Sequence, residues 1–197
     1  MRKSYSNSFY LGGSRILENR DIPKKEKSIV FIGFMGAGKT TIGKLVAEKL
    51  DRSFIDTDEE IENEYGMPVS QIFQRLGEKE FREKEKAFIT NLSQKGLQIL
   101  SLGGGAFLQE EIREACLANC IVTYIHMSWE SWENRIPLIM DTRPVLHGKS
   151  LDEIKELFEK RQEIYAHHHI KIETDNLEAE EICNQIVDML LSYWEQK

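Results

Sequence analysis

The 197-residue sequence lacks several features that would assign it to particular classes of protein. No apolar run is long enough to cross a bilayer, and no signal-peptide core lies near the start, so we expect no membrane association. The formal net charge of −7 argues against nucleic acid as a partner, because binding to a phosphate backbone favours a basic surface. No internal repeat or low-complexity tract is present. The length and the 41% hydrophobic content favour one globular domain.

Cysteine is also scarce, and its spacing is not that of a metal site. The three cysteines are Cys116, Cys120 and Cys183. Cys116 and Cys120 would lie one helical turn apart. An odd number without paired spacing favours reduced thiols over a disulfide or a zinc site, and with them a cytoplasmic location.

Residues 1–27 differ in composition from the rest of the chain. They are polar, contain two adjacent glycines and end in a charged run. Glu18, Asp21 and Glu26 argue against a transit peptide. We therefore expect a flexible N-terminal extension without an assigned function, followed by one domain over residues 28–197.

From residue 28 onward, strand patterns alternate with helix patterns. The order predicts an α/β fold of three layers, in which a five-stranded parallel sheet is covered by helices on both faces. Ligands of such sheets bind at the carboxyl ends of the strands. Two capping boxes, Thr57 with Glu60 and Ser150 with Glu153, each predict a helix start. The strands are predicted over 28–33, 53–58, 97–105, 120–127 and 169–174, and the other helices over 39–50, within 66–77, and over 78–94, 109–118 and 177–194.

The segment GFMGAGKTT, residues 33–41, directly follows the first predicted strand. Gly33, Gly38, Lys39 and Thr40 have the spacing of a phosphate-binding loop. Glycines in such a loop let backbone N–H groups point at phosphate oxygens, and the following helix adds the positive end of its dipole. Lys39 would reach the β- and γ-phosphates, and the Thr40 hydroxyl would ligate Mg²⁺. An incidental glycine-rich turn is the weaker interpretation.

Two carboxylates lie at the end of the second predicted strand, at Asp56 and Asp58. Acidic residues commonly begin helices, so a purely structural role is one interpretation. Alternate residues of an extended segment share a face, so the alternative is a pair near the phosphate loop. One carboxylate would then support Mg²⁺ and the other would meet an acceptor hydroxyl, an arrangement that suits phosphoryl transfer.

Arginines and glycines later in the chain are candidates for an acid-binding site. Arg82 and Glu85 would be neighbours on a helix, either as an ordinary solvated pair or as an arginine held ready to bind a carboxylate. Arg161 on a later helix allows the same two interpretations. Three successive glycines, 103–105, end the third predicted strand and allow a ligand to approach the backbone closely.

Residues 133–150 contain arginines in a long connection that predicts a mobile lid, assigned to about 134–149. Arg135 and Arg143 are either ordinary surface residues or groups that close over a triphosphate. The consecutive histidines 167–169 do not converge on one metal, so we expect a structural role for them.

Together, GFMGAGKTT, FIDTD, GEKEFREKE, LSLGGGA, RPVL and KRQEIY resemble the shikimate kinase family in order and spacing, from residue 28 to the C-terminus. The resemblance implies a nucleoside-monophosphate-kinase-like fold with a lid. It also implies transfer of the γ-phosphoryl group of ATP to the 3-hydroxyl of shikimate, a step towards chorismate and the aromatic amino acids.

The resemblance further implies roles for individual residues. Asp58 would bind the shikimate hydroxyls and act as a base, and Lys39 and Arg143 would be the other catalytic groups. The residues implied for ATP binding are Gly36, Ala37, Gly38, Lys39, Thr40, Thr41, Arg135 and Arg143; those for the acid substrate are Asp58, Arg82, Glu85, Gly103, Gly104, Gly105 and Arg161; and those for Mg²⁺ are Thr40 and Asp56.

Two other functions stay open at this point. One is a related kinase that acts on another polyol or sugar acid such as gluconate, and the other is a catalytically silent homologue that binds a partner. Lys39, Thr40, Asp58 and Arg143 argue against a silent protein. We expect no obligate protein partner. In the segment ETDNLE, residues 173–178, no residue is assigned a contact with the adenine base.

Overall fold

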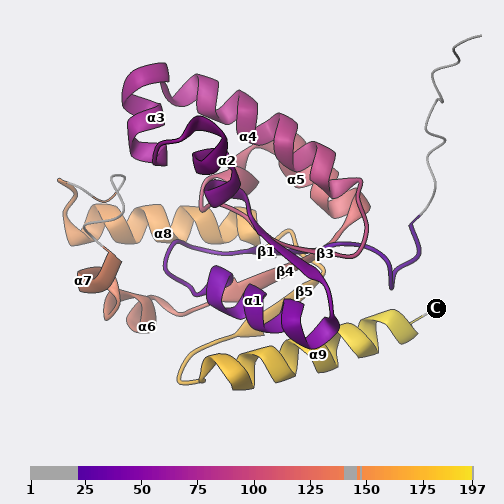
Figure 1. Ribbon diagram of the computed structural model, residues 1–197. Coiled ribbons are helices and arrows are strands. Elements are labelled where there is room, and N and C mark those ends of the chain that lie inside the picture. The colour runs from indigo at the N-terminus through magenta and orange to yellow at the C-terminus, as the bar shows by residue number, and fades with distance from the viewer. Residues whose placement is uncertain (1–21, 140–145, 147, 197) are drawn as a thin grey trace, which may run out of the picture.

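Five parallel strands form the centre of the molecule, in the order β2-β3-β1-β4-β5 (Figure 1). The computed structural model describes residues 22–139, 146 and 148–196. Residues 1–21 of the expected extension and the expected lid residue Arg143 lie outside these ranges. The strands are β1 (Ile29–Ile32), β2 (Ser53–Asp56), β3 (Gln98–Ser101), β4 (Ile121–His126) and β5 (Ile170–Glu173).

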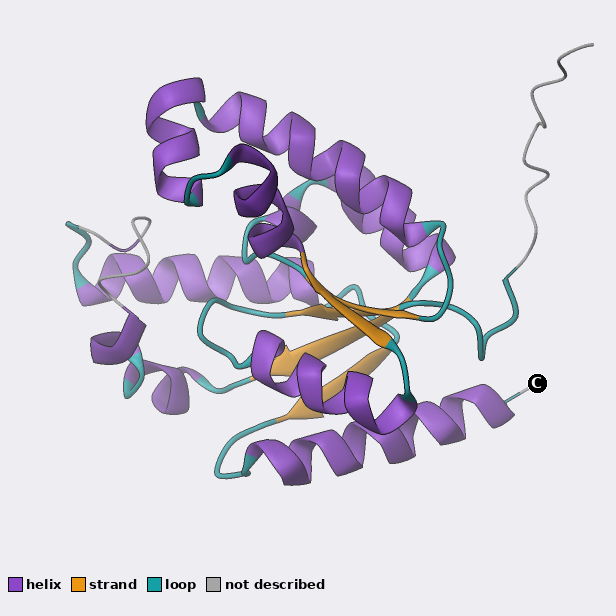
Figure 2. Cartoon of the chain, in the orientation of Figure 1, coloured by secondary structure: helices purple, strands orange, loops and turns teal. Residues whose placement is uncertain are grey.

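Helices cover both faces of this sheet and confirm the expected three layers (Figure 2). On one face lie α1 (Lys39–Leu50) and α9 (Ala179–Glu195), which pack against each other and against the sheet. On the other face lie α4 (Glu78–Ser93), α5 (Glu110–Asn119) and α8 (Leu151–Tyr165). Two shorter helices, α2 (Thr57–Tyr65) and α3 (Val69–Leu76), pack against α4.

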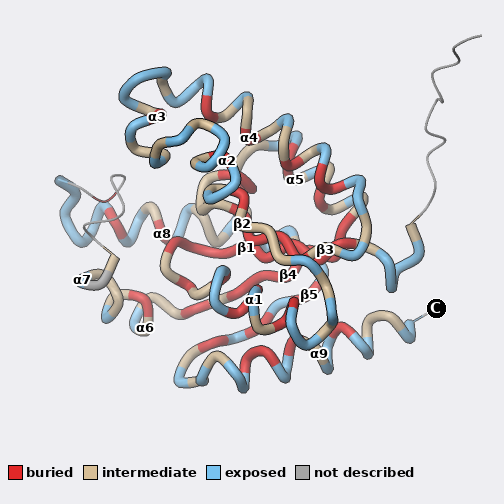
Figure 3. Tube along the Cα trace, viewed as in Figure 1, coloured by how far each residue is buried: buried red, intermediate tan, exposed pale blue. Residues whose placement is uncertain are grey.

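The core follows from the apolar composition of the central strands. Every residue of β1 is buried, with Ile29 and Phe31 facing α1 and α9, and Val30 and Ile32 facing the opposite layer. A parallel strand that is covered on both faces has this continuous apolar pattern. Figure 3 shows the buried positions concentrated in the sheet and on the inner faces of the helices. Because β1 is central, the loop that follows it begins from a firmly packed strand.

One expected helix start is wrong and the other is confirmed. Ser150 and Glu153 form the expected capping box at α8. At α2, however, the N-cap is Asp56, whose Oδ1 accepts hydrogen bonds from the N–H groups of Asp58 and Glu59. Thr57 does not cap because its hydroxyl is buried and donates to the carbonyl of Ser101 on β3. As a result β2 ends at Asp56, and Asp58 lies in the first turn of α2 instead of in an extended segment.

The connection after β4 is more regular than the sequence pattern indicated. It contains α6 (Trp129–Glu133) and α7 (Ile136–Ile139). Most of the expected lid after residue 139 lies outside the described ranges. Pro137 is compatible with α7 because proline is tolerated in the first turn of a helix. Between β3 and α5, a single 3-10 turn, η1, spans Ala106–Leu108. No helix within the described ranges is both long and apolar enough to cross a membrane.

Candidate active site

The phosphate-loop segment has the predicted position between β1 and α1. Gly33 has φ +147°, and a Cβ there would lie 2.5 Å from the carbonyl oxygen of Ile125, so only glycine fits without a shift. Gly38 is the N-cap residue of α1 with φ +96°. Ala37 is buried and donates its N–H to the carbonyl of Phe34 at 3.2 Å, whereas Thr41 is exposed on α1. The loop therefore curls at the amino end of a helix, the position that favours anions.

The Lys39 side chain folds back over this loop. Its Nζ donates to the carbonyl oxygens of Gly33, at 2.8 Å, and Phe34, at 3.0 Å. The side chain is almost entirely buried, with 9% exposed. An ammonium group held here lies beside the loop and does not extend into solvent.

Oxygen atoms suited to a divalent cation meet at the start of α1 and the end of β2. Thr40 Oγ1 donates to Asp56 Oδ2 at 2.7 Å and lies 3.5 Å from Ser101 Oγ. Mg²⁺ prefers oxygen ligands, and it is usually held by one or two carboxylates together with substrate phosphates and water. Within the described ranges no group of three or more Asp, Glu, His or Cys side chains is arranged to hold a metal ion, and a site of this kind requires none. The residues present fit Mg²⁺ bound together with a nucleotide.

Asp58 lies against the backbone of the glycine segment after β3. A Cβ placed on Gly103 would overlap Asp58 Oδ1 and lie 2.8 Å from Asp58 Cγ, so the carboxylate occupies the space where a side chain would be. Thr57 fixes this approach, since its hydroxyl accepts from the N–H of Gly103 at 3.3 Å while donating to Ser101. Sequence reasoning missed this role of Thr57 because it assigned the hydroxyl to a cap.

Arg82 approaches the same glycine segment from α4. A Cβ on Gly105 would lie 2.7 Å from Arg82 Nη2. Nη1 donates to Glu85 Oε2 at 2.7 Å, while Nε and Nη2 donate to Glu78 Oε1 at 3.2 and 3.1 Å. Three of the five N–H groups thus have acceptors within the described structure, which leaves one on each terminal nitrogen. A guanidinium with an N–H group left on each terminal nitrogen can donate to an added carboxylate.

Arg82 and Glu85 are not the ordinary solvated pair that was one interpretation of the sequence, because the Glu85 carboxyl is completely buried. Its Oε2 also accepts from Gln109 Nε2 at 2.7 Å, a contact for which the sequence contains no signal. Burial raises the pKa of Glu85 to about 7, against the opposing effect of the Arg82 charge and hydrogen bond, and the nearby Asp58 charge raises it further.

This raised pKa predicts a specific pH dependence of folding stability. Between about pH 4.5 and 7 the folded chain holds a proton on Glu85 that the unfolded chain releases. The free energy of unfolding contributed by Glu85 therefore falls as pH rises through this window, by up to about 3 kcal/mol. Urea titrations at pH 5 and pH 7 give the free energy of unfolding at each pH. Between pH 5 and pH 7 this free energy should fall less in Glu85→Gln than in the wild type. The exposed Glu83→Gln is the control and should follow the wild type, and equal losses for wild type and Glu85→Gln would contradict the assignment.

Arg161, on α8, is the third charged side chain at this glycine segment, after Asp58 and Arg82. Its Nη1 donates to the carbonyl of Gly104 at 3.3 Å, and the buried Tyr165 hydroxyl donates to the same oxygen at 2.9 Å. The Nε atom is buried without a hydrogen-bond partner, and no ion pair within the described structure includes Arg161. Burial lowers the pKa of Arg161, and the neighbouring Arg82 charge acts in the same direction. A cationic group in this setting would gain from an added carboxylate.

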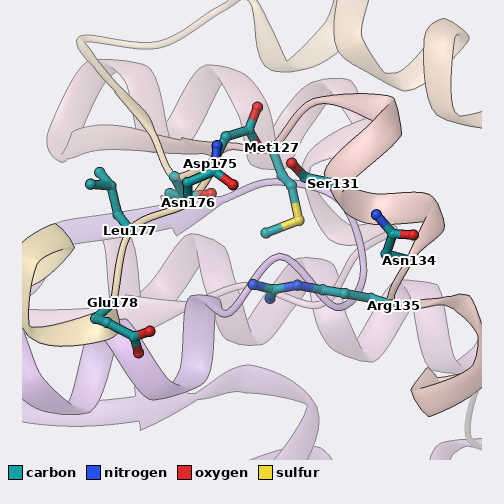
Figure 4. A pocket seen from close by; sticks show the side chains of 9 residues that line it. Met127, Ser131, Asn134, Arg135, Asp175, Asn176, Leu177 and Glu178 are labelled. Atoms are coloured by element: carbon teal, nitrogen blue, oxygen red, sulfur yellow. The ribbon is translucent and has the colours of Figure 1, made fainter.

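A separate cavity of about 410 Å³ lies between the segments that follow β4 and β5 (Figure 4). Arg135 extends across it and donates to the carbonyl of Gly36 at 3.1 Å, which joins the cavity to the loop. Thr174 and Asp175 are held in its wall by hydrogen bonds to the backbone of His126 and Ser128. Sequence reasoning assigned no contact in this segment. The lining residues are Met127, Ser131, Asn134, Arg135, Thr174, Asp175, Asn176, Leu177 and Glu178.

His169 and the three cysteines have contacts or burial that fit a structural role. His169 Nδ1 accepts from the N–H of Val122, which supports the edge of the sheet. Cys116, Cys120 and Cys183 are buried and are not in disulfides, as expected.

Comparison with known proteins identifies the family to which these features belong. The family model described as shikimate kinase matches residues 35–191, most of the chain. The chain belongs to the shikimate kinase family. A shikimate kinase of Bacillus pumilus is 54% identical over 90% of this chain and 96% of the relative, and one of Bacillus subtilis is 50% identical over 89% and 95%.

Solved structures agree with this membership. Shikimate kinase from Acinetobacter baumannii, solved in complex with shikimate, is 32% identical with a TM-score of 0.80 and covers 88% of this chain and 97% of that one. A gluconokinase from Sinorhizobium meliloti, at 16% identity and a TM-score of 0.50, shares the fold alone. The family and the fold expected from the sequence, including the nucleoside-monophosphate-kinase-like architecture, are therefore confirmed, and the chain is a kinase.

Proposed function

We propose that this chain transfers the γ-phosphoryl group of ATP to the 3-hydroxyl of shikimate with Mg²⁺, a step towards chorismate and the aromatic amino acids. One observation carries the proposal beyond family membership. Asp58, Arg82 and Arg161 come from three different helices and meet at the glycine segment 103–105. One carboxylate and two guanidinium groups around an open backbone suit a small acid that carries hydroxyl groups.

The phosphate loop supplies the other half of the reaction. The turn over residues 36–41 holds the phosphates through backbone N–H groups, and Lys39 moves from the loop carbonyls to the phosphate oxygens. Thr40 and Asp56 would hold Mg²⁺, which would supply neutralisation of the phosphate charge. Phosphoryl transfer needs such positioning and electrostatic stabilisation more than covalent chemistry from the protein.

The acceptor side of the proposal assigns one task to each residue. Arg82 and Arg161 bind the shikimate carboxylate, Glu85 orients Arg82, and residues 103–105 line the pocket. Asp58 receives a hydrogen bond from the acceptor hydroxyl and takes its proton as the oxygen attacks phosphorus. In the nucleotide site, the cavity next to Arg135 receives the adenine base. Arg143 as a further phosphate-binding group stays a prediction, as do the lid and the cytoplasmic location.

The proposal is tested by ADP release with a panel of acceptors. Activity should require shikimate, ATP and Mg²⁺, and it should stop when EDTA removes the metal. Gluconate is the informative alternative acceptor because it also has a carboxylate and hydroxyl groups. A higher kcat/KM with gluconate than with shikimate would show that shikimate is not the preferred substrate. Nucleotide binding without turnover of any acceptor would support a silent binding protein.

Gly103→Ala tests the position of Asp58 without changing a charged group. The new methyl group would have to displace the Asp58 carboxylate, whose Cγ lies 2.8 Å from its position. A misplacement of about 1 Å in a catalytic group costs roughly 10²-fold, so we expect turnover to fall by about that factor. ADP affinity, measured on the same protein, should stay within about twofold because the phosphate loop is untouched. Normal turnover would show that Asp58 is not the group on which the reaction depends.

A further inference from the structure

The ring of Phe34, a residue of the phosphate loop, lies against the acid-binding Arg161. The Arg161 guanidinium carbon is 5.3 Å from the ring centroid, within the range of a cation–π contact. The ring is only 2% exposed and cannot easily turn away. Trp132 and Phe158 pack on it edge-on, with centroid distances of 4.9 and 5.0 Å.

The backbone of the same residue contacts the phosphate-binding lysine. The carbonyl oxygen of Phe34 accepts from Lys39 Nζ at 3.0 Å. The next carbonyl, that of Met35, accepts from the buried Trp132 Nε1 at 2.7 Å. One rigid residue therefore touches the nucleotide machinery through its backbone and the acid-binding arginine through its ring.

Arg161 has few other contacts that would fix its orientation. Its guanidinium has a hydrogen bond to the Gly104 carbonyl and lies beside the Tyr165 hydroxyl, and its Nε has no partner among the described residues. Glu78 and Glu85 hold Arg82 through ion pairs, and Arg161 has no comparable carboxylate partner there. The aromatic face of Phe34 is thus a main constraint on the plane of this guanidinium.

We propose that Phe34 is a positioning residue for Arg161 and that it makes the affinity for the acid substrate depend on the state of the phosphate loop. The proposal rests on the proposed function, because it takes Arg161 as a ligand of the shikimate carboxylate. When Lys39 leaves the Phe34 carbonyl for a bound nucleotide, the backbone that carries the ring adjusts, and the ring transmits this change to Arg161. Nucleotide and shikimate binding are then coupled, and the coupling is the same in both directions.

The test compares Phe34→Leu with Phe158→Leu. Both remove an aromatic ring from the same buried cluster, but only Phe34 lies under Arg161. Phe34→Leu should raise KM for shikimate by about 5- to 30-fold, the effect of losing a desolvated cation–π contact, with kcat, and the Kd of ADP measured without shikimate, within about twofold. Phe158→Leu should raise KM for shikimate less than about threefold, because the cation–π contact of Arg161 is with the Phe34 ring and the Phe158 ring has none with it.

A second measurement tests the coupling itself. The Kd of shikimate is measured with and without saturating ADP, and in the wild type the two values should differ. In Phe34→Leu their ratio should move towards one, whereas in Phe158→Leu it should keep the wild-type value. If Phe34→Leu does not fold, Phe34→Met replaces it, since methionine fills more of the space without an aromatic face.

Several outcomes would overturn the proposal. They are an unchanged KM for shikimate in Phe34→Leu, an equal rise in Phe158→Leu, an equal rise in the Kd of ADP measured without shikimate, or a ratio of shikimate Kd values that is the same in Phe34→Leu and the wild type. Failure of the proposed function is a different result. In that case the wild-type enzyme itself would not phosphorylate shikimate.

Discussion

Asp58→Asn should lower turnover with shikimate by about 10²–10⁴-fold, the usual range for loss of a general base. The amide has nearly the same size and keeps some hydrogen bonds, but it lacks the charge and the basicity. The N-cap of α2 is Asp56, so the substitution does not remove the cap of the helix. Nucleotide affinity should stay near the wild-type value because Lys39 and Thr40 are unchanged. Turnover and ADP affinity are measured on the same protein.

Glu59→Gln is the matched control for this experiment. Glu59 is the next residue of the same helical turn and is exposed. It should keep turnover within about twofold, as most exposed positions do. Near-normal turnover in Asp58→Asn would reject the acceptor role of Asp58. Loss of nucleotide binding in Asp58→Asn would place this carboxylate in the metal site instead.

Arg161→Ala should raise KM for shikimate by roughly 30- to 5,000-fold, which corresponds to about 2–5 kcal/mol for the loss of one partner of a desolvated charge pair. KM for ATP should change little, because Arg161 contacts the glycine segment and not the base cavity. Arg161→Lys should restore only part of the affinity, since an ammonium group lacks the planar fork and rests less well on the Phe34 ring. Steady-state kinetics with each substrate varied in turn provide the measurement.

The exposed Lys160→Ala provides the control on the same helix. It removes a positive charge one position away and should leave both KM values within about twofold. Equal increases in KM for shikimate and ATP in Arg161→Ala would assign Arg161 a structural role. A full recovery with lysine would show that charge alone matters at this position.

The sequence was sufficient for features that depend on local spacing. The phosphate loop, the alternation of strands and helices, and the capping box at Ser150 all follow from residues close together in the chain, and the structure has them as expected. The apolar run over β1 likewise indicates a buried strand, and all of its residues are buried. Such patterns need no knowledge of what packs against them.

Features that depend on contacts between distant segments were not predictable. Asp56 and Thr57 are both good caps, and the choice between them is decided by the Ser101 carbonyl, which binds the Thr57 hydroxyl. The hydrogen bond from Gln109 to Glu85 and the cavity wall near Asp175 likewise form only when separate segments meet. The sequence pattern around Pro137 indicates a loop, because only the actual backbone shows that this residue lies in the first turn of α7.

The pairing of β2 with β3 has a consequence for how acceptor choice can change. Asp56, the last residue of β2, is in register with Ser101, the last residue of β3. The intervening chain carries Asp58, Arg82 and Glu85 on α2 and α4, and it leaves and rejoins the sheet on adjacent strands (Figure 1). Because this segment begins at the carboxyl end of β2 and ends at the amino end of the adjacent β3, it can be exchanged between homologous kinases without rebuilding the central strand or its phosphate loop. In evolution or in design, a new acceptor specificity would thus require one transplanted segment and a matching change at position 161 on α8.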